Sequence, residues 1–129
     1  MLLPGHIHCI WTLPYGDTDF STQWGLIKAG FSKRMKKAEG RSNADISQSR
    51  IRQRESSYWQ RRFWEHGIRD QRYYNSHMDY IHFNPVKHGL VSAPNDWEYS
   101  SFHRMVDEGV YDIEWGTVDK MEFKGIGRE

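Results

Sequence analysis

The chain contains the stretch Asp79-Tyr80-Ile81-His82-Phe83-Asn84-Pro85-Val86-Lys87-His88-Gly89, from which the rest of the sequence is best interpreted. Tyr80 and Asn84 are four residues apart. A helix that continues to the proline would therefore present both side chains on one face, one turn apart. Such a face would place a phenol, which can act as a nucleophile, beside an amide oxygen, which can bind a metal ion.

A second candidate group lies near the N-terminus, where His6 and His8 flank Ile7. We predict a strand over residues 7–13, so both imidazoles would project from one side with Cβ atoms roughly 6.5 Å apart. Two ring nitrogens at that separation can converge on one ion. Alone the pair is weak evidence, because two ordinary surface histidines have the same pattern. We expect this segment to meet the Tyr80 stretch and form one active site.

The combination favours phosphoryl transfer over the ordinary structural role of each residue. A metal ion held by two histidines and an amide can polarise a phosphate, while a neighbouring tyrosine attacks phosphorus. An unperturbed tyrosine has a pKa near 10, so it needs the metal or a nearby cation such as Lys87 or Arg72. We interpret the remaining histidines as structural: His66, His77, His82, His88 and His103.

The composition bounds the class of protein. A chain of 129 residues is long enough for one domain, and 37% hydrophobic residues with 27% charged ones are typical of a globular protein. It has no apolar run long enough to cross a bilayer, and Pro4-Gly5 interrupts any signal-peptide core. One cysteine, Cys9, excludes an internal disulfide. We expect a cytoplasmic protein without membrane contact.

The charge is concentrated in one half of the chain. Residues 28–72 carry a net charge of +8, whereas residues 73–129 carry −5. A basic segment that includes Tyr and Trp suits a nucleic-acid strand, although a solvated basic surface has the same composition. The candidate DNA-binding residues are Lys28, Lys33, Arg34, Lys36, Lys37, Arg61, Arg62, Arg69, Arg72 and Lys87.

Hydrophobic periodicity predicts helices over about 19–38, 70–83 and 97–107. Tyr74, Met78 and Ile81 form the expected core stripe of the second helix. Besides residues 7–13, we predict a strand at 63–68 and a short strand or extended arm at 111–115. The expected domain covers residues 1–116 and includes a long polar loop at 39–57, and residues 117–129 form a weakly ordered tail.

Several stretches resemble one protein family. Gly5-His6-Ile7-His8-Cys9-Ile10-Trp11-Thr12-Leu13-Pro14 resembles the His-hydrophobe-His strand of the single-tyrosine HUH transposases. One branch of them, the REP-associated tyrosine transposases, is similar in three further blocks that follow in the same order. These are Tyr58-Trp59-Gln60-Arg61-Arg62-Phe63-Trp64-Glu65-His66, the stretch from Asp79 to Val91, and Trp97-Glu98-Tyr99-Ser100-Ser101-Phe102-His103.

The resemblance implies an α+β fold, with an HUH-type antiparallel β-sheet flanked by helices. It implies cleavage and rejoining of single-stranded DNA at repeats that contain a hairpin. Tyr80 would attack a backbone phosphate, keep the 5′ phosphate as a covalent phosphotyrosine and release a 3′ hydroxyl. His6, His8 and Asn84 would bind Mg²⁺ or Mn²⁺. The implied protein is bacterial, has hairpin or single-stranded DNA as its partner, and is a monomer or a dimer.

The resemblance also includes one departure. In the family, a section of strand, helix and strand precedes the His-hydrophobe-His strand, and we expect this chain to lack it through truncation or a misplaced start codon. Two alternatives to a nicking enzyme follow. One is a remnant that binds hairpin or single-stranded DNA without cutting it, and the other is a metal-dependent hydrolase without a covalent step.

Overall fold

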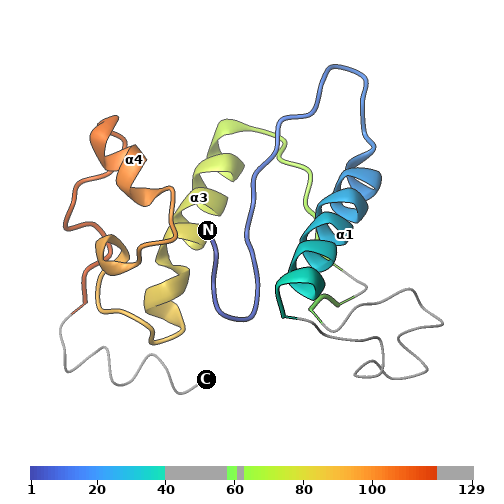
Figure 1. The fold of residues 1–129 in the computed structure, drawn as a ribbon. Coiled ribbons are helices and arrows are strands. Elements are labelled where there is room, and N and C mark those ends of the chain that lie inside the picture. The colour runs from blue at the N-terminus through green and yellow to red at the C-terminus, as the bar shows by residue number, and fades with distance from the viewer. Residues whose placement is uncertain (40–57, 61–62, 119–129) are drawn as a thin grey trace. The chain divides into compact units, whose positions relative to one another are not determined.

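The computed structural model describes residues 1–39, 58–60 and 63–118 (Figure 1). The chain divides into two compact units, the first formed by Met1–Ile10 with the described part of Gly67–Glu129, the second by Trp11–His66. The described elements are α1 (Phe20–Glu39), α3 (Gln71–Lys87), the 3₁₀ helix η2 (Pro94–Asp96) and α4 (Phe102–Asp107). The prediction of one domain over residues 1–116 stays a prediction. None of the described helices has the length and apolar character needed to cross a membrane.

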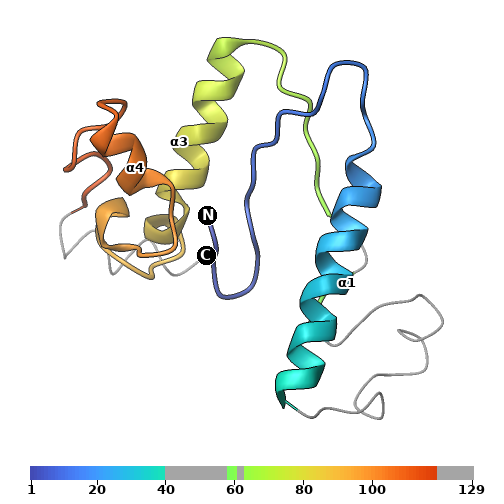
Figure 2. The same ribbon diagram turned by 45° about the horizontal axis from the view of Figure 1, so that its top comes forward.

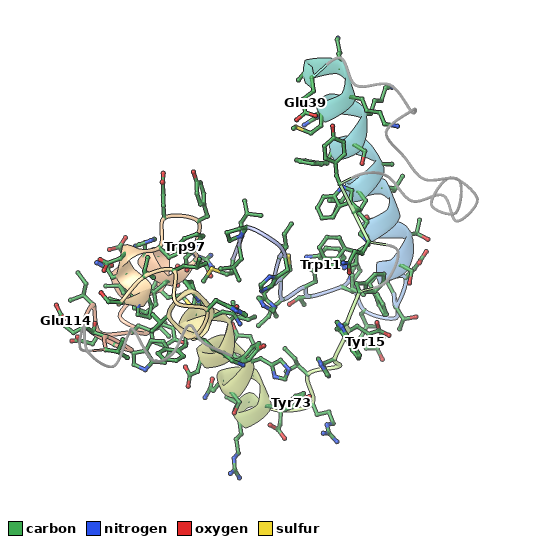
Figure 3. The ribbon with its side chains drawn as sticks, turned by 90° about the horizontal axis from the view of Figure 1, so that it is seen from below. Trp11, Tyr15, Glu39, Tyr73, Trp97 and Glu114 are labelled. Carbon is green, nitrogen blue, oxygen red and sulfur yellow. The ribbon has the colours of Figure 1, made fainter. Side chains whose placement is uncertain are left out.

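Helix α1 of the second unit confirms the helix predicted at about 19–38. Its first turn begins after Asp19, whose carboxylate accepts a hydrogen bond from the Thr22 amide at 3.2 Å and so satisfies one free N–H group. Aromatic side chains of α1 make the packing contacts of this unit. Trp24 stacks on Trp11, with ring centroids 4.8 Å apart, and Trp11 is labelled in Figure 3.

The remaining packing of the second unit is also aromatic. Phe20 and Trp24 both contact Phe63, and the ring of Phe31 lies 5.4 Å from that of Trp59. No strand forms at 63–68, where the described backbone makes no ladder. The polar loop predicted at 39–57 lies outside the described residues except for Glu39, which ends α1.

Helix α3 is the central element of the first unit and corrects one predicted boundary. Asp70 caps it, because its carboxylate accepts the Tyr73 amide hydrogen bond at 2.8 Å. The helix does not end near residue 83 as expected but continues through Pro85 to Lys87. The proline removes only its own N–H donor, and at the end of the helix His88 N donates to Asn84 O at 3.0 Å. Burial outweighs the local bias against helix before a proline, since Pro85 and Val86 are fully buried.

The core of the first unit lies where α3 meets the chain around α4. Met78, Ile81 and Val86 of α3 are buried, as is Phe102 of α4, whereas Tyr74 is only half-buried. The last helix, predicted at about 97–107, starts later than expected, at Phe102, and the residues just before its predicted start form η2. Residues 111–115 are a turn and not a strand. Val118, the last described residue of the predicted tail, donates its amide to Ser92 O at 2.9 Å.

The N-terminal segment does not form the strand predicted at 7–13. Among the described residues the β pairing consists of one isolated antiparallel bridge, between Leu2 and Ile7. The chain folds back on itself at Pro4-Gly5, with hydrogen bonds from Leu3 N to His6 O and from His8 N to Met1 O. The physical reason is that a strand needs a ladder with a neighbouring strand, and no other described segment supplies one. The antiparallel sheet of the expected fold is therefore not confirmed.

Gly116 tests how closely the turn after α4 packs on η2. Its φ is +72°, and an added Cβ would lie 2.9 Å from Pro94 Cγ and 3.3 Å from Phe83 Cδ2. Gly109 has φ +75° but open space around it, so it is the matched control. We expect Gly109→Ala to cost about 1–2 kcal/mol of unfolding free energy from backbone strain alone, and Gly116→Ala to cost clearly more. Urea denaturation followed by circular dichroism measures both, and equal losses would contradict the close packing.

Candidate active site

The two histidines are held by the N-terminal turn. Besides the backbone bonds within it, this turn is docked on the segment before α4. Trp97 donates its indole N–H to Leu2 O at 2.9 Å, and Leu2 N donates to Tyr99 O at 2.9 Å. Figures 1 and 2 show the start of the chain, in dark blue, beside α3. The turn thus fixes the backbone from which His6 and His8 project.

The first unit brings the histidine segment and the Tyr80 stretch together. The ring centroids of His6 and His8 are 4.9 Å apart, and the ring of His8 lies 5.7 Å from that of Tyr80. His6 Nε2 lies 3.3 Å from Asn84 Oδ1, within hydrogen-bond distance. Tyr80 is 50% exposed, whereas Asn84 is fully buried one helical turn away. A solvent-accessible phenol therefore stands beside a group of imidazole and amide atoms.

The surroundings of His8 favour its neutral imidazole. Burial lowers the pKa of His8, and the charges of His6, the N-terminus and His88 lower it further, while the nearby side chain of Asn84 partly opposes them. A neutral imidazole has a lone pair available for a metal. His8 Nε2 and Asn84 Nδ2 are both buried without a hydrogen-bond partner.

Two imidazoles and one amide oxygen form a set of donors that fits a divalent cation. His6, His8 and Asn84 would supply two imidazole nitrogens and one oxygen. Within the described ranges there is no group of three or more His, Cys, Asp or Glu side chains arranged to hold a metal ion. A site at this place would therefore take its third donor from the amide of Asn84.

Lys87 and His88, which follow Pro85 in the chain, also lie beside the candidate site. The ring of His88 lies 5.3 Å from that of His6, and Lys87 Nζ lies 5.3 Å from the ring centroid of Tyr80. From the sequence, we interpret His88 as structural and Lys87 as a candidate DNA contact and a cation that could assist Tyr80. The available signal was their spacing: His88 follows Asn84 by four residues, which is the spacing of one helical face.

The opposite side of α3 is tied to the chain around α4. His82 is fully buried and lies 2.8 Å from Ser101 Oγ, and burial lowers its pKa to about 4. The Tyr111 hydroxyl donates a hydrogen bond to Asp79 Oδ1 at 2.7 Å. Burial is the main cause that raises the pKa of Tyr111 well above its ordinary value, and the Asp79 carboxylate raises it further. These contacts agree with the structural role expected for His82.

The predicted DNA-binding residues divide between the two units. Lys28, Lys33, Arg34, Lys36 and Lys37 lie on α1, and Arg69, Arg72 and Lys87 lie at or within α3. Lys28 takes part in local packing, since its Nζ donates to Gln60 O at 3.0 Å and lies 5.5 Å from the ring centroid of Phe63. Arg69 lies over the ring of Tyr73. Arg61 and Arg62 are outside the described residues.

No family model matches the chain. It is 47% identical over 115 residues to the REP-associated tyrosine transposase of Escherichia coli K12, an alignment that covers 89% of this chain and 59% of that protein. A Haemophilus influenzae protein described by the same family name is 42% identical over 124 residues, which is 96% of this chain and 68% of the relative. The chain thus spans about three fifths of the first relative's length.

The fold agrees with a solved relative. A structure of a REP-associated tyrosine transposase bound to a REP hairpin superposes with a TM-score of 0.62 at 43% identity, covering 85% of this chain and 58% of that one. The chain shares the fold of that protein over the matched region. The sequence identity extends over almost all of this chain and over more than two thirds of the second relative. The chain therefore belongs to the family of REP-associated tyrosine transposases.

Proposed function

We propose that this protein nicks and rejoins single-stranded DNA at repeats that contain a hairpin, with Tyr80 as the nucleophile. The observation that carries the proposal is the convergence of His6, His8 and Asn84 beside the half-exposed phenol of Tyr80. The solved relative bound to a REP hairpin supports hairpin DNA as the substrate class.

The chemistry is a transesterification at phosphorus. The Tyr80 oxygen forms a bond to the phosphorus atom and releases its proton to solvent, while the bond from phosphorus to the 3′ oxygen breaks. The departing 3′ oxygen takes up a proton and becomes a free hydroxyl, and the 5′ phosphate stays on Tyr80. Attack by a 3′ hydroxyl on this phosphotyrosine reverses the steps and rejoins a strand.

The donor set indicates which residues would hold the expected Mg²⁺ or Mn²⁺. They are His6, His8 and Asn84, and the bound ion would withdraw charge from the phosphate oxygens. The protein's own groups position the reacting atoms. The docked N-terminal turn fixes the imidazoles, and α3 keeps Tyr80 one turn from Asn84, so the nucleophile and the phosphate site are set by one rigid helix.

Tyr80→Phe removes one oxygen and little packing, so we expect it to eliminate both nicking and the covalent adduct while folding and hairpin binding persist. Tyr73→Phe is the matched control, because Tyr73 lies on the same helix about 10 Å further along its axis. The assay incubates a labelled hairpin carrying a single-stranded flank with Mn²⁺ and detects the adduct on a denaturing gel.

The opposite pattern, an adduct that persists in Tyr80→Phe and disappears in Tyr73→Phe, would show that the nucleophile is wrongly assigned. The absence of an adduct from the unmodified protein on every flank sequence would favour hairpin binding without cleavage.

His6→Ala or His8→Ala should abolish cleavage and leave DNA affinity within a few-fold, because each removes one imidazole from the donor set. Isothermal titration calorimetry with Mn²⁺ should show one site in the unmodified protein and none in either variant. Asn84→Ala should weaken the site less, since a neutral amide oxygen is the weakest of the three donors. Unchanged Mn²⁺ binding in the double histidine variant would rule out this donor set.

Affinity for single strands should fall steeply with salt, because cations that bind phosphates release counterions. Neutralising Lys33, Arg34, Lys36 and Lys37 together should flatten this dependence. The control replaces the same number of charges within residues 104–128. Fluorescence anisotropy across a salt series measures both sets, and equal effects would mean that the basic residues of α1 are only a solvated surface.

A further inference from the structure

We propose that Lys87 is a catalytic residue, whose ammonium group binds a non-bridging oxygen of the phosphate that Tyr80 attacks. The inference rests on the proposed function, and it gives Lys87 a role distinct from that of the other basic residues. Lys87 gains and loses no proton in this role. It holds the phosphate beside the nucleophile and stabilises the negative charge that grows on the oxygen as the Tyr80–phosphorus bond forms.

The position of Lys87 is the first argument. It is the last residue of α3, seven residues after Tyr80 and therefore about 10 Å further along the helix axis. Side chains of a helix point back toward its N-terminus, so a lysine can span most of that distance. The Nζ atom in fact lies 5.3 Å from the Tyr80 ring centroid. Both side chains are exposed, so a DNA strand can reach them.

The contact between Lys87 and Tyr80 depends on the continuation of α3 beyond Pro85. A helix that ended near residue 83, as the proline would suggest, would not keep residue 87 in register with the face of Tyr80. Because α3 continues through Pro85, the lysine stays on the helix whose face carries Tyr80 and Asn84. The fully buried Pro85 and Val86 fix the backbone immediately before it.

The charge around Lys87 is the second argument. Within the described part of the chain no carboxylate forms an ion pair with it, and the acid that precedes Tyr80, Asp79, accepts the hydroxyl hydrogen bond of Tyr111. Among the described residues, the ring contacts and side-chain hydrogen bond of Tyr80, His6 and His8, apart from that with Lys87, are made by imidazoles and an amide. The lysine charge is therefore available to an anion that approaches the phenol.

The first experiment separates catalysis from affinity. Adduct formation is measured in single-turnover conditions at saturating hairpin DNA for Lys87→Gln, Lys87→Arg and the control Arg104→Gln, an exposed cation on α4 whose Nε lies 4.0 Å from Glu108 Oε1. We expect Lys87→Gln to slow the step about 100-fold, the lower end of the range seen when one charge-stabilising donor is lost. Lys87→Arg should restore most of the rate, and Arg104→Gln should leave it unchanged. Equal saturated rates for Lys87→Gln and Arg104→Gln would overturn the proposal.

The second experiment does not depend on cleavage. In a Tyr80→Phe background, single methylphosphonates are placed at successive positions of the flank, each removing one negative charge. If Lys87 contacts one phosphate, the affinity loss from that substitution should disappear in the Tyr80→Phe, Lys87→Gln double variant. The phosphate at which this loss disappears, which we call the position coupled to Lys87, should be the one at which the unmodified protein forms its adduct.

The outcomes separate this inference from the proposed function. Coupling at no position, or at a position other than the cleaved one, overturns the role of Lys87 even where nicking is observed. An unmodified protein that forms no adduct overturns nicking and with it the catalytic role, whereas coupling at a single phosphate would then leave Lys87 as a binding contact only.

Discussion

The passage of α3 through Pro85 is the constraint on which the site depends. A proline inside a helix removes one hydrogen bond and crowds the preceding turn, at a cost of about 3 kcal/mol. Full burial of the Val86 side chain offsets about 1.5–3 kcal/mol of this, and the buried proline ring adds apolar contact of its own. The helix consequently keeps its register as far as Lys87, so that Tyr80, Asn84 and Lys87 belong to one rigid element.

The two sides of α3 do different work. On one side, His82 bonds to Ser101 and Asp79 accepts from Tyr111, which fixes the rotation of the helix against the chain around α4. That rotation in turn directs Tyr80 and Asn84 toward the N-terminal turn. The turn is anchored independently, through Trp97 and Tyr99, so the histidines are positioned by the same segment that leads into α4.

Local signals were sufficient to predict the helices but not their ends. The expected stripe depends only on neighbours in sequence; Met78 and Ile81 are buried as expected, whereas its third member, Tyr74, is only half-buried. The continuation through Pro85 depends on tertiary burial, which the local rule for residues before proline does not include. The strand at 7–13 was wrong for a related reason, since a strand exists only with a partner and its alternating pattern is equally compatible with an extended turn.

The residues of the site could be predicted in part because their spacing encodes a helical face. Tyr80 and Asn84 were identified by their separation of four residues, and the same argument applied once more would have reached His88. The proposed role of Lys87 required the structure, because a spacing of seven residues keeps Lys87 on the face of Tyr80 only if the helix continues through Pro85. The contact also depends on a long side chain that reaches back along the helix.

The charge of the site follows from this choice of residues and explains why a phosphodiester suits it. The side chains whose contacts define the site are neutral or cationic, with imidazoles, an amide and a phenol beside one ammonium group. Asp79, adjacent to Tyr80 in sequence, is held by Tyr111. A carboxylate beside Tyr80 would repel a phosphate, whereas an amide at Asn84 offers an oxygen without a negative charge. The site thus favours an anionic group next to an exposed phenol, which is the arrangement that the proposed attack on a DNA backbone requires.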